Sequence, residues 1–476
     1  MSFTAPEFLL FLAAVLILYR AAPQRWRWAV LLPASYFFYA CHNVWLLSLI
    51  LLTTLTSYLC ALRMEKAASR GRRRAILAVD MAVCLGILFV FKYLDFALGG
   101  VFSLLNLFGE HGEFHALNLI LPMGISFYVF QTLSYTIDVY RGTVPAEKHL
   151  GYFALFVVYF PQLVAGPIER PGDLLPQLRR SPTPQAGDIS QGLRCLVRGY
   201  AKKVLIADYV ARFVDAAYGD AANAGGAALA MATILFAVQI YCDFSGYSDI
   251  ALGCARLMGV RLTENFRRPY AAVTVRDFWR RWHISLTRWF TDYLYIPLGG
   301  GRKGLARRCV NILTVFLVSG LWHGADVTFL IWGGLHGLYL AAETLLPGER
   351  EERPGLRLPR RAVTFALVCF AWVFFRTENL AHAVEVLRAV AADFRPENAL
   401  AGLAMGLPEL LTTAGLLALL PMLEALPTLT GAGTEGSAPQ SSRAVTLYFL
   451  LITAVVLCRC VALAAGGDTT FLYFQF

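Results

Sequence analysis

The sequence predicts an all-α polytopic membrane protein with about 11 to 12 membrane-spanning helices, together with re-entrant and interfacial helices. Three observations lead to this prediction. Of the 476 residues, 57% are hydrophobic and 16% are charged, whereas a soluble domain is about 45–50% apolar and about 25% charged. Apolar runs of spanning length recur along the chain, and basic residues gather in particular loops. This composition excludes a soluble globule, a coiled coil and a disordered chain.

The apolar runs are the expected spans, because a helix needs about 20 apolar residues to cross a bilayer and fewer where it bends or re-enters. A shorter run, 151–166, ends in FPQLVAGPI and is predicted to be re-entrant. The expected spans are 6–20, 28–41, 44–62, 75–98, 117–138, 193–215, 228–250, 309–321, 327–346, 362–376, 399–421 and 444–464.

The formal net charge of +10 is concentrated in the loops 20–27, 63–74 and 256–308. Because cytoplasmic loops carry the excess of Lys and Arg, these loops are predicted to lie in the cytoplasm and the N-terminus outside it. The loop 99–116 has neither Lys nor Arg and is predicted to be extracytoplasmic. We therefore expect a multi-pass membrane protein with this orientation.

The cysteines have no spacing typical of zinc or iron–sulfur sites, so the sequence predicts no metal centre. The basic residues are explained by topology and by contact with membrane lipid, and no nucleic-acid partner is expected.

Polar residues concentrate in the middle third of the chain. The stretch QIYCDFSGYSDIALG, 239–253, brings together Asp243, Ser245, Tyr247 and Asp249 at the end of an expected span. Acidic residues at membrane depth usually face the protein interior or a wet cavity. Two interpretations are open: a buried hydrogen-bonded network that ties helices together, and direct contact with a substrate.

The segment 275–304 is too charged to span a membrane. At helical spacing Phe278, Trp282 and Trp289 share one face, which predicts an amphipathic helix at the cytoplasmic interface with His283 within it. The basic loop PLGGGRKG follows, and such a loop can hold phosphate through backbone N–H groups and cationic side chains. An interfacial anchor with no further role is the alternative.

His323 lies in LVSGLWHGADVTF, one of the most apolar parts of the chain. Glycines at 320 and 324 predict a break between two short spans there. A neutral histidine can take a proton from a hydroxyl group and return it to a leaving group, as acyl transfer from a thioester to an alcohol requires. A buried histidine with a purely structural role is the alternative, and His336 is a second candidate.

Five blocks together resemble the membrane-bound O-acyltransferases, and among them the membrane subunits that O-acetylate alginate. The blocks are FPQLVAGPIERP, IYCDFSGYSDIALG, FWRRWHISLTRWFTDYLYIPLGG, SGLWHGA and FLYFQF. The resemblance implies helices around a central tunnel that is open to a cytoplasmic donor. It also implies a catalytic histidine at His323 and a second functional histidine at His283.

The resemblance further implies a function: transfer of an acetyl group from cytoplasmic acetyl-CoA across the membrane for O-acetylation of an exported polysaccharide such as alginate. A periplasmic SGNH-type acetyltransferase would complete the transfer, and no tightly bound cofactor is expected. Arg280, Arg281, Arg302 and Lys303 become candidates for binding the CoA phosphates. We expect one domain over 1–476, with a catalytic core at about 117–346 and peripheral helices at 1–116 and 362–476.

Two other functions fit parts of the sequence. A related branch of the same family moves D-alanine from a carrier protein onto teichoic acid, and charge patterning does not distinguish the donors. A proton-coupled transporter or channel could use His323 and the acids of 239–253 as a proton relay, although the chain has no internal repeat of the kind that many transporters are built from. Covalent transfer from labelled acetyl-CoA separates an enzyme from a transporter.

Overall fold

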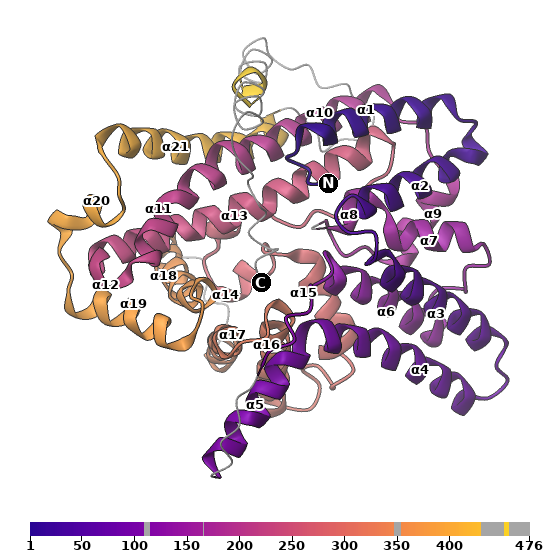
Figure 1. The fold of residues 1–476 in the computed structure, drawn as a ribbon, viewed down its shortest axis with the longest axis horizontal. Coiled ribbons are helices and arrows are strands. Elements are labelled where there is room, and N and C mark those ends of the chain that lie inside the picture. Colours follow the sequence, from indigo (N-terminus) through magenta and orange to yellow (C-terminus); the bar gives the residue numbers. More distant parts are fainter. Residues whose placement is uncertain (109–114, 165, 347–353, 430–451, 457–476) are drawn as a thin grey trace. The chain divides into compact units, whose positions relative to one another are not determined.

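The computed structural model describes residues 1–108, 115–164, 166–346, 354–429 and 452–456 (Figure 1). The regular structure in these ranges is helical, and no strand occurs in them. The described residues form two compact units, Met1–Asp188 with Cys254–Thr263, and Ile189–Gly253 with Glu264–Phe476. The all-α prediction is therefore confirmed over the described part of the chain.

The first unit contains the N-terminal helices, and Asp80 of α4 accepts a hydrogen bond from Ser57 of α3 at 2.8 Å in its buried interior. A π-helical segment, Phe89–Tyr93, joins α4 to α5. The helices of this unit are α1 (Pro6–Ala21), α2 (Arg27–Ala40), α3 (Leu47–Lys66), α4 (Arg70–Leu88), α5 (Leu94–Leu107), α6 (Ile125–Arg141), α7 (Leu150–Val158), α8 (Phe160–Leu163) and α9 (Pro171–Arg180).

The second unit contains the polar middle third of the sequence. A π-helical segment, Ala201–Ala207, joins α10 to α11, and a second one, Thr291–Tyr295, follows α15. The helices that lie wholly or mainly in this unit are α10 (Ala186–Tyr200), α11 (Asp208–Gly219), α12 (Ala221–Ala224), α13 (Gly226–Leu257), α14 (Val275–Trp279), α15 (Ile284–Phe290), α16 (Leu305–His323), α17 (Val327–Leu345), α18 (Arg357–Arg376), α19 (Leu380–Ala392), α20 (Ala399–Gly402) and α21 (Leu407–Leu429).

Within the described ranges, six helical segments are long and apolar enough to cross a membrane. They are Leu47–Lys66, Arg70–Leu107, Gly226–Leu257, Leu305–His323, Arg357–Arg376 and Leu407–Ala425. Each contains or overlaps an expected span, so the prediction of a multi-pass membrane protein is confirmed. The other expected spans within the described residues, 6–20, 28–41, 117–138, 193–215 and 327–346, are not among these six segments.

Several predicted boundaries differ from the structure. Residues 117–124 are not helical, and the expected span 117–138 begins only at Ile125, after the left-handed residue Gly124. The expected span 399–421 is interrupted between α20 and α21. Hydropathy detects apolar length but not the local backbone turns that end a helix. Apart from 452–456, the expected span 444–464 lies outside the described residues, as does the C-terminal block FLYFQF.

The prediction of one continuous amphipathic helix in 275–304 is wrong. Helix α14 ends at Trp279 and α15 begins at Ile284, with His283 between them in a left-handed conformation at φ 42°. Contacts with the preceding loop cause the break. The N–H group of Ile284 donates to the carbonyl oxygen of Asn265 at 3.0 Å, and the N–H group of Arg267 donates to the carbonyl oxygen of Arg281 at 2.9 Å.

Helices α16 and α17 form an antiparallel hairpin that carries His323 at its bend, and they lie side by side in Figure 1. Asp326 begins α17, because its carboxylate accepts a hydrogen bond from the N–H group of Thr328 at 2.8 Å. Gly320 and Gly333 face each other across the hairpin, where a Cβ atom on Gly333 would clash with the carbonyl oxygen of Phe316. Glycine therefore permits the close approach of the two helices.

We expect Gly333→Ala to lower the free energy of unfolding by about 1–3 kcal/mol, because the added methyl group overpacks the hairpin. The matched control is Gly334→Ala, since a Cβ atom at that position meets only a Leu317 side-chain carbon, at 3.7 Å. Thermal melting of both variants in detergent measures the difference. Equal melting temperatures for the two variants would contradict this account of the hairpin.

Candidate functional site

His323 is the last residue of α16, and its side chain is enclosed by aromatic rings. It is 5% exposed, and its ring centroid lies 4.9 Å from those of Trp322 and Trp332 and 5.4 Å from that of Phe375. These rings come from α16, α17 and α18. The immediate surroundings of His323 are therefore largely apolar.

His283 is buried between α14 and α15 and is 1% exposed. Its Nδ1 lies 3.3 Å from Oδ1 of Asn265, and its ring meets Phe244 edge to face at 4.7 Å between centroids. Burial lowers the pKa of His283 to about 3, so the ring is neutral at physiological pH. A neutral imidazole has one nitrogen that donates a hydrogen bond and one that accepts a hydrogen bond.

Trp322 contacts both predicted histidines. Its ring centroid lies 6.0 Å from that of His283 and 4.9 Å from that of His323. Both histidines belong to the second unit, although 40 positions separate them in the sequence numbering. The structure therefore brings the two predicted catalytic residues to one tryptophan.

His336 is fully buried in α17 and has a hydrogen bond that orients its ring. Nε1 of Trp279 donates to Nδ1 of His336 at 3.2 Å. The indole nitrogen is a donor only, so Nδ1 of His336 must be the acceptor and the ring is held as a neutral tautomer. This contact anchors α14 to α17 and supports a structural interpretation of His336.

The predicted acidic cluster in α13 forms two buried ion-pair groups. Asp249 pairs with Arg198 and, at 2.9 Å, with Lys202, whereas Asp243 pairs with Lys203 at 2.5 Å. Lys203 also pairs with Asp208 at 2.8 Å. Lys202 and Lys203 are neighbours in the π-helical segment Ala201–Ala207, and such segments are frequent at functional sites.

Glycines let α10 and α13 approach closely enough for these pairs. A Cβ atom on Gly199 would lie 2.6 Å from the carbonyl oxygen of Gly246, and one on Gly253 would lie 2.8 Å from that of Gly192. The seven-residue spacing within each helix places both glycines on one face. The charged side chains next to this seam are buried, so each needs its partner.

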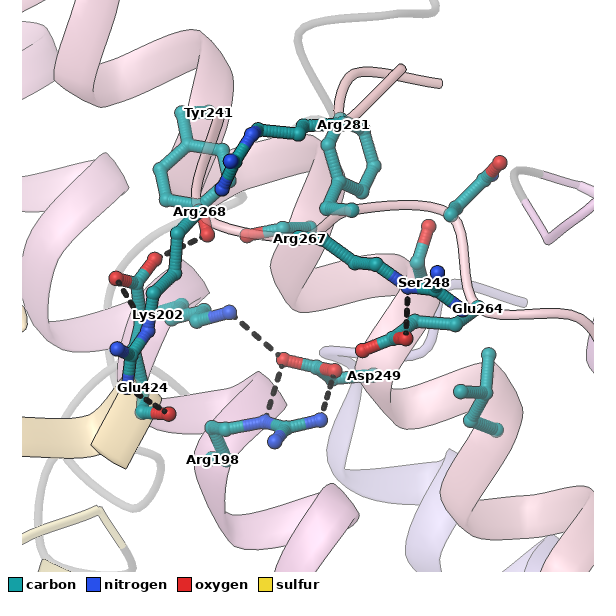
Figure 2. Close-up of a pocket in the computed structure, with 14 residues that line it drawn as sticks. Arg198, Lys202, Tyr241, Ser248, Asp249, Glu264, Arg267, Arg268, Arg281 and Glu424 are labelled. Carbon is teal, nitrogen blue, oxygen red and sulfur yellow. Dashed lines mark hydrogen bonds and ion pairs between the residues drawn. The ribbon is translucent and has the colours of Figure 1, made fainter. Parts of the chain in front are cut away.

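A cavity of about 370 Å³ opens beside Asp249 (Figure 2). Five cationic and three anionic side chains line it, which leaves a net positive lining. Figure 2 shows Asp249 held between Arg198 and Lys202, and Glu424 beside Tyr241 and Arg268. The lining residues are Arg198, Lys202, Tyr241, Ser245, Ser248, Asp249, Leu252, Glu264, Asn265, Phe266, Arg267, Arg268, Arg281 and Glu424.

Three predicted site residues line this cavity, namely Ser245, Asp249 and Arg281. Nε of Arg281 donates to Asp277 at 2.8 Å. Asp243 and Tyr247 are buried in α13 but do not line it. Arg280, Arg302 and Lys303 are exposed and lie outside it, so the structure does not bring the four basic residues together there.

The sequence analysis did not predict most of the residues that line this cavity. Lys202 carried a detectable signal, because it stands beside a second lysine, Lys203, within the expected span 193–215. Arg267, Arg268 and Asn265 had none, because they belong to a short polar loop that resembles any cytoplasmic connection. Among the described residues, no group of three or more His, Cys, Asp or Glu side chains is placed to hold a metal ion.

Comparisons with known proteins agree with the motif resemblance. Residues 145–373 match the model of the membrane-bound O-acyltransferase family. The "Probable alginate O-acetylase AlgI" of Pseudomonas putida is 41% identical over 392 residues, which cover 82% of this chain and 80% of that protein.

Other relatives carry related names. The "Peptidoglycan O-acetyltransferase" of Helicobacter pylori is 35% identical, over 76% of this chain and 73% of that protein. The "Teichoic acid D-alanyltransferase" of Bacillus subtilis is 23% identical, over 56% of this chain and 71% of that protein.

We expect Asp249→Asn to lower the free energy of unfolding by about 3–5 kcal/mol, because it leaves the buried Lys202 and the partly buried Arg198 with a neutral partner. The control is Glu264→Gln, which removes the exposed pair with Arg267 and should cost about 0–1 kcal/mol. Melting temperatures in detergent compare the two. A smaller loss for Asp249→Asn than for Glu264→Gln would refute the role of this pair.

Proposed function

The chain belongs to the membrane-bound O-acyltransferase family, and we propose that it moves an acetyl group from cytoplasmic acetyl-CoA across the membrane for O-acetylation of an exported polysaccharide such as alginate. One observation carries this proposal: the 41% identity to a probable alginate O-acetylase over about four fifths of both chains. Family membership makes the chain an O-acyltransferase of the membrane, and the relatives' names support acetyl as the group.

In the proposed reaction, His323 is the general base or the transient acyl acceptor. His283 orients the reacting groups or relays a proton. With His323 as base, an acceptor hydroxyl oxygen attacks the thioester carbonyl carbon while the histidine takes the hydroxyl proton. The tetrahedral intermediate collapses, the C–S bond breaks, and the proton passes to the CoA thiolate. The products are an O-acetyl ester and CoA. The aromatic enclosure of His323 supports this role by excluding water.

We propose that basic side chains bind the phosphates of the donor. The set suggested by the sequence is Arg280, Arg281, Arg302 and Lys303, and Arg281 is the member that lines the cationic cavity. Phosphate oxygens accept strong hydrogen bonds from guanidinium groups. The remaining three residues are exposed and would act at the entrance as a solvated basic surface.

The proposed setting is the bacterial inner membrane, with the N-terminus outside and the basic loops in the cytoplasm. The catalytic core would be about 117–346 of a single membrane domain over 1–476, with central helices around a tunnel. A periplasmic SGNH-type acetyltransferase is the proposed partner that completes transfer to the polymer. The polar network of Asp243, Ser245, Tyr247 and Asp249 would support the donor side of the tunnel.

The similarity to a peptidoglycan O-acetyltransferase favours one alternative acceptor, with the same donor and residues. The similarity to D-alanyltransferases is weaker and covers less of the chain, so a D-alanyl donor is the second candidate. A neighbouring gene for a carrier protein and its ligase would favour D-alanine. A neighbouring gene for an SGNH-type acetyltransferase would favour acetyl.

We expect His323→Gln to reduce polysaccharide O-acetylation by at least 100-fold, because the residue that receives the hydroxyl proton is lost. O-acetyl content of the exported polymer is measured with the protein level held constant. The control is His382→Gln on α19, where the ring contacts Tyr218. Unchanged acetylation in the His323 variant would show that His323 is not catalytic.

We expect Arg281→Ala to raise the KM for acetyl-CoA about tenfold, as the loss of one charge-assisted hydrogen bond implies. The KM for acetyl-pantetheine, which lacks the nucleotide phosphates, should not change. Exposed Arg388 on α19 provides the matched arginine control, Arg388→Ala. An equal rise in KM for both donors would show that Arg281 does not recognise phosphate.

A further inference from the structure

We propose that Asn265 is a catalytic residue that connects the cationic cavity to His283. Its amide oxygen holds the histidine, and its amide N–H group donates a hydrogen bond to the thioester carbonyl of the acyl donor. This inference rests on the proposed function, since it takes a thioester as the donor. Asn265 belongs to the loop between α13 and α14, and its side chain is 1% exposed.

The orientation of the Asn265 amide follows from its neighbours. The backbone N–H group of Ser285 can only donate, and it lies 3.1 Å from Oδ1 of Asn265. The hydroxyl group of Ser285 donates to the same oxygen at 2.8 Å. Oδ1 must therefore be the carbonyl oxygen, and the NH₂ group points the other way.

This orientation determines the tautomer of His283. Nδ1 of His283 lies 3.3 Å from Oδ1, which is an acceptor only, so Nδ1 must carry the proton. In a neutral ring the lone pair is then on Nε2. Asn265 thus holds His283 with its proton-accepting nitrogen turned away from the amide, which is what a base or relay in acyl transfer requires.

The NH₂ group is the end of the Asn265 amide that is left for a ligand. Asn265 is a lining residue, and its buried Nδ2 has no acceptor among the described residues. A buried N–H group without a partner is costly, so a ligand acceptor would be strongly favoured there. Ser245 and Ser248 line the same cavity, and their buried hydroxyl oxygens also lack partners among the described residues.

A carbonyl oxygen fits the Asn265 N–H group best. An amide N–H group is a neutral donor, and the carbonyl of the donor that must approach a histidine is that of the thioester. As the acceptor hydroxyl attacks, this oxygen gains negative charge, and the C–S bond then breaks to release CoA. A donor aimed at such an oxygen typically contributes about 100-fold to 1,000-fold to kcat.

Asn265→Asp tests the N–H group, because it keeps an oxygen toward Ser285 and His283 but replaces the NH₂ group by an oxygen. We expect kcat for transfer from acetyl-CoA to fall about 100-fold in purified protein. We also expect the Kd for acetyl-CoA to rise about threefold to tenfold while the Kd for CoA, which has no acyl carbonyl, does not change.

The matched control is Asn311→Asp, another fully buried asparagine, whose Nδ2 already donates to the carbonyl oxygen of Gly300 at 2.9 Å. A general loss of stability in this variant moves the two Kd values together and leaves their ratio unchanged. Nitrogen NMR of ¹⁵N-histidine-labelled protein, with His283→Gln used to assign the signal, should show the proton of His283 on Nδ1. In Asn265→Ala the signal should shift toward the other tautomer.

Three outcomes would overturn the assignment. The first is a wild-type His283 with its proton on Nε2, and the second is an Asn265→Asp variant with the kcat and Kd ratio of the wild type. The third is a wild-type protein that neither binds acetyl-CoA nor transfers from it, which would overturn the proposed function as well. If the wild-type protein transfers acetyl from acetyl-CoA, the proposed function stands even where the role of Asn265 is refuted.

Discussion

Pairing of buried charge between α10, the adjoining π-helical segment and α13 is the constraint on which the second unit depends. Asp249 pairs with Arg198 and Lys202, and Asp243 pairs with Lys203. Removing such groups from water costs several kcal/mol per ion unless geometry and hydrogen bonds compensate. The glycine seam allows the required approach, and the π-helical segment turns two adjacent lysines toward two different aspartates. The charged wall of the cavity follows from this pairing.

The second unit contains two different environments that a short chain of residue contacts connects. The cavity is polar and net cationic, whereas the surroundings of His323 are aromatic. Asn265 lines the cavity and binds His283, whose ring contacts Trp322, and Trp322 in turn contacts His323. Anion binding requires cationic, polar surroundings, whereas water exclusion requires apolar ones. An acyltransferase whose donor is charged therefore needs one environment of each kind. The left-handed backbone at His283 is held by the backbone hydrogen bonds that connect this break to the preceding loop.

The sequence predicted the helical class, the six apolar segments that are long enough to span and the bend at His323, because each depends on local composition. Hydropathy predicts a span wherever apolar length suffices, and glycines at 320 and 324 indicated the break. The segment 275–304 shows the limit of this reasoning. Its helical periodicity was real, but hydrogen bonds from a loop about 20 residues earlier ended the helix at Trp279. No local pattern contains that information.

The sequence by itself determined that this is a membrane O-acyltransferase with histidines at 283 and 323, because motif identity and apolar length are properties of the chain. Tertiary structure alone decided which charges pair, which basic residues share a cavity and which atom of His283 carries its proton. Arg281 joined Arg198 and Lys202 there, whereas its neighbour Arg280 did not. The physical reason is that burial and hydrogen bonding depend on contacts between residues far apart in the chain, and spacing along one helix does not specify them.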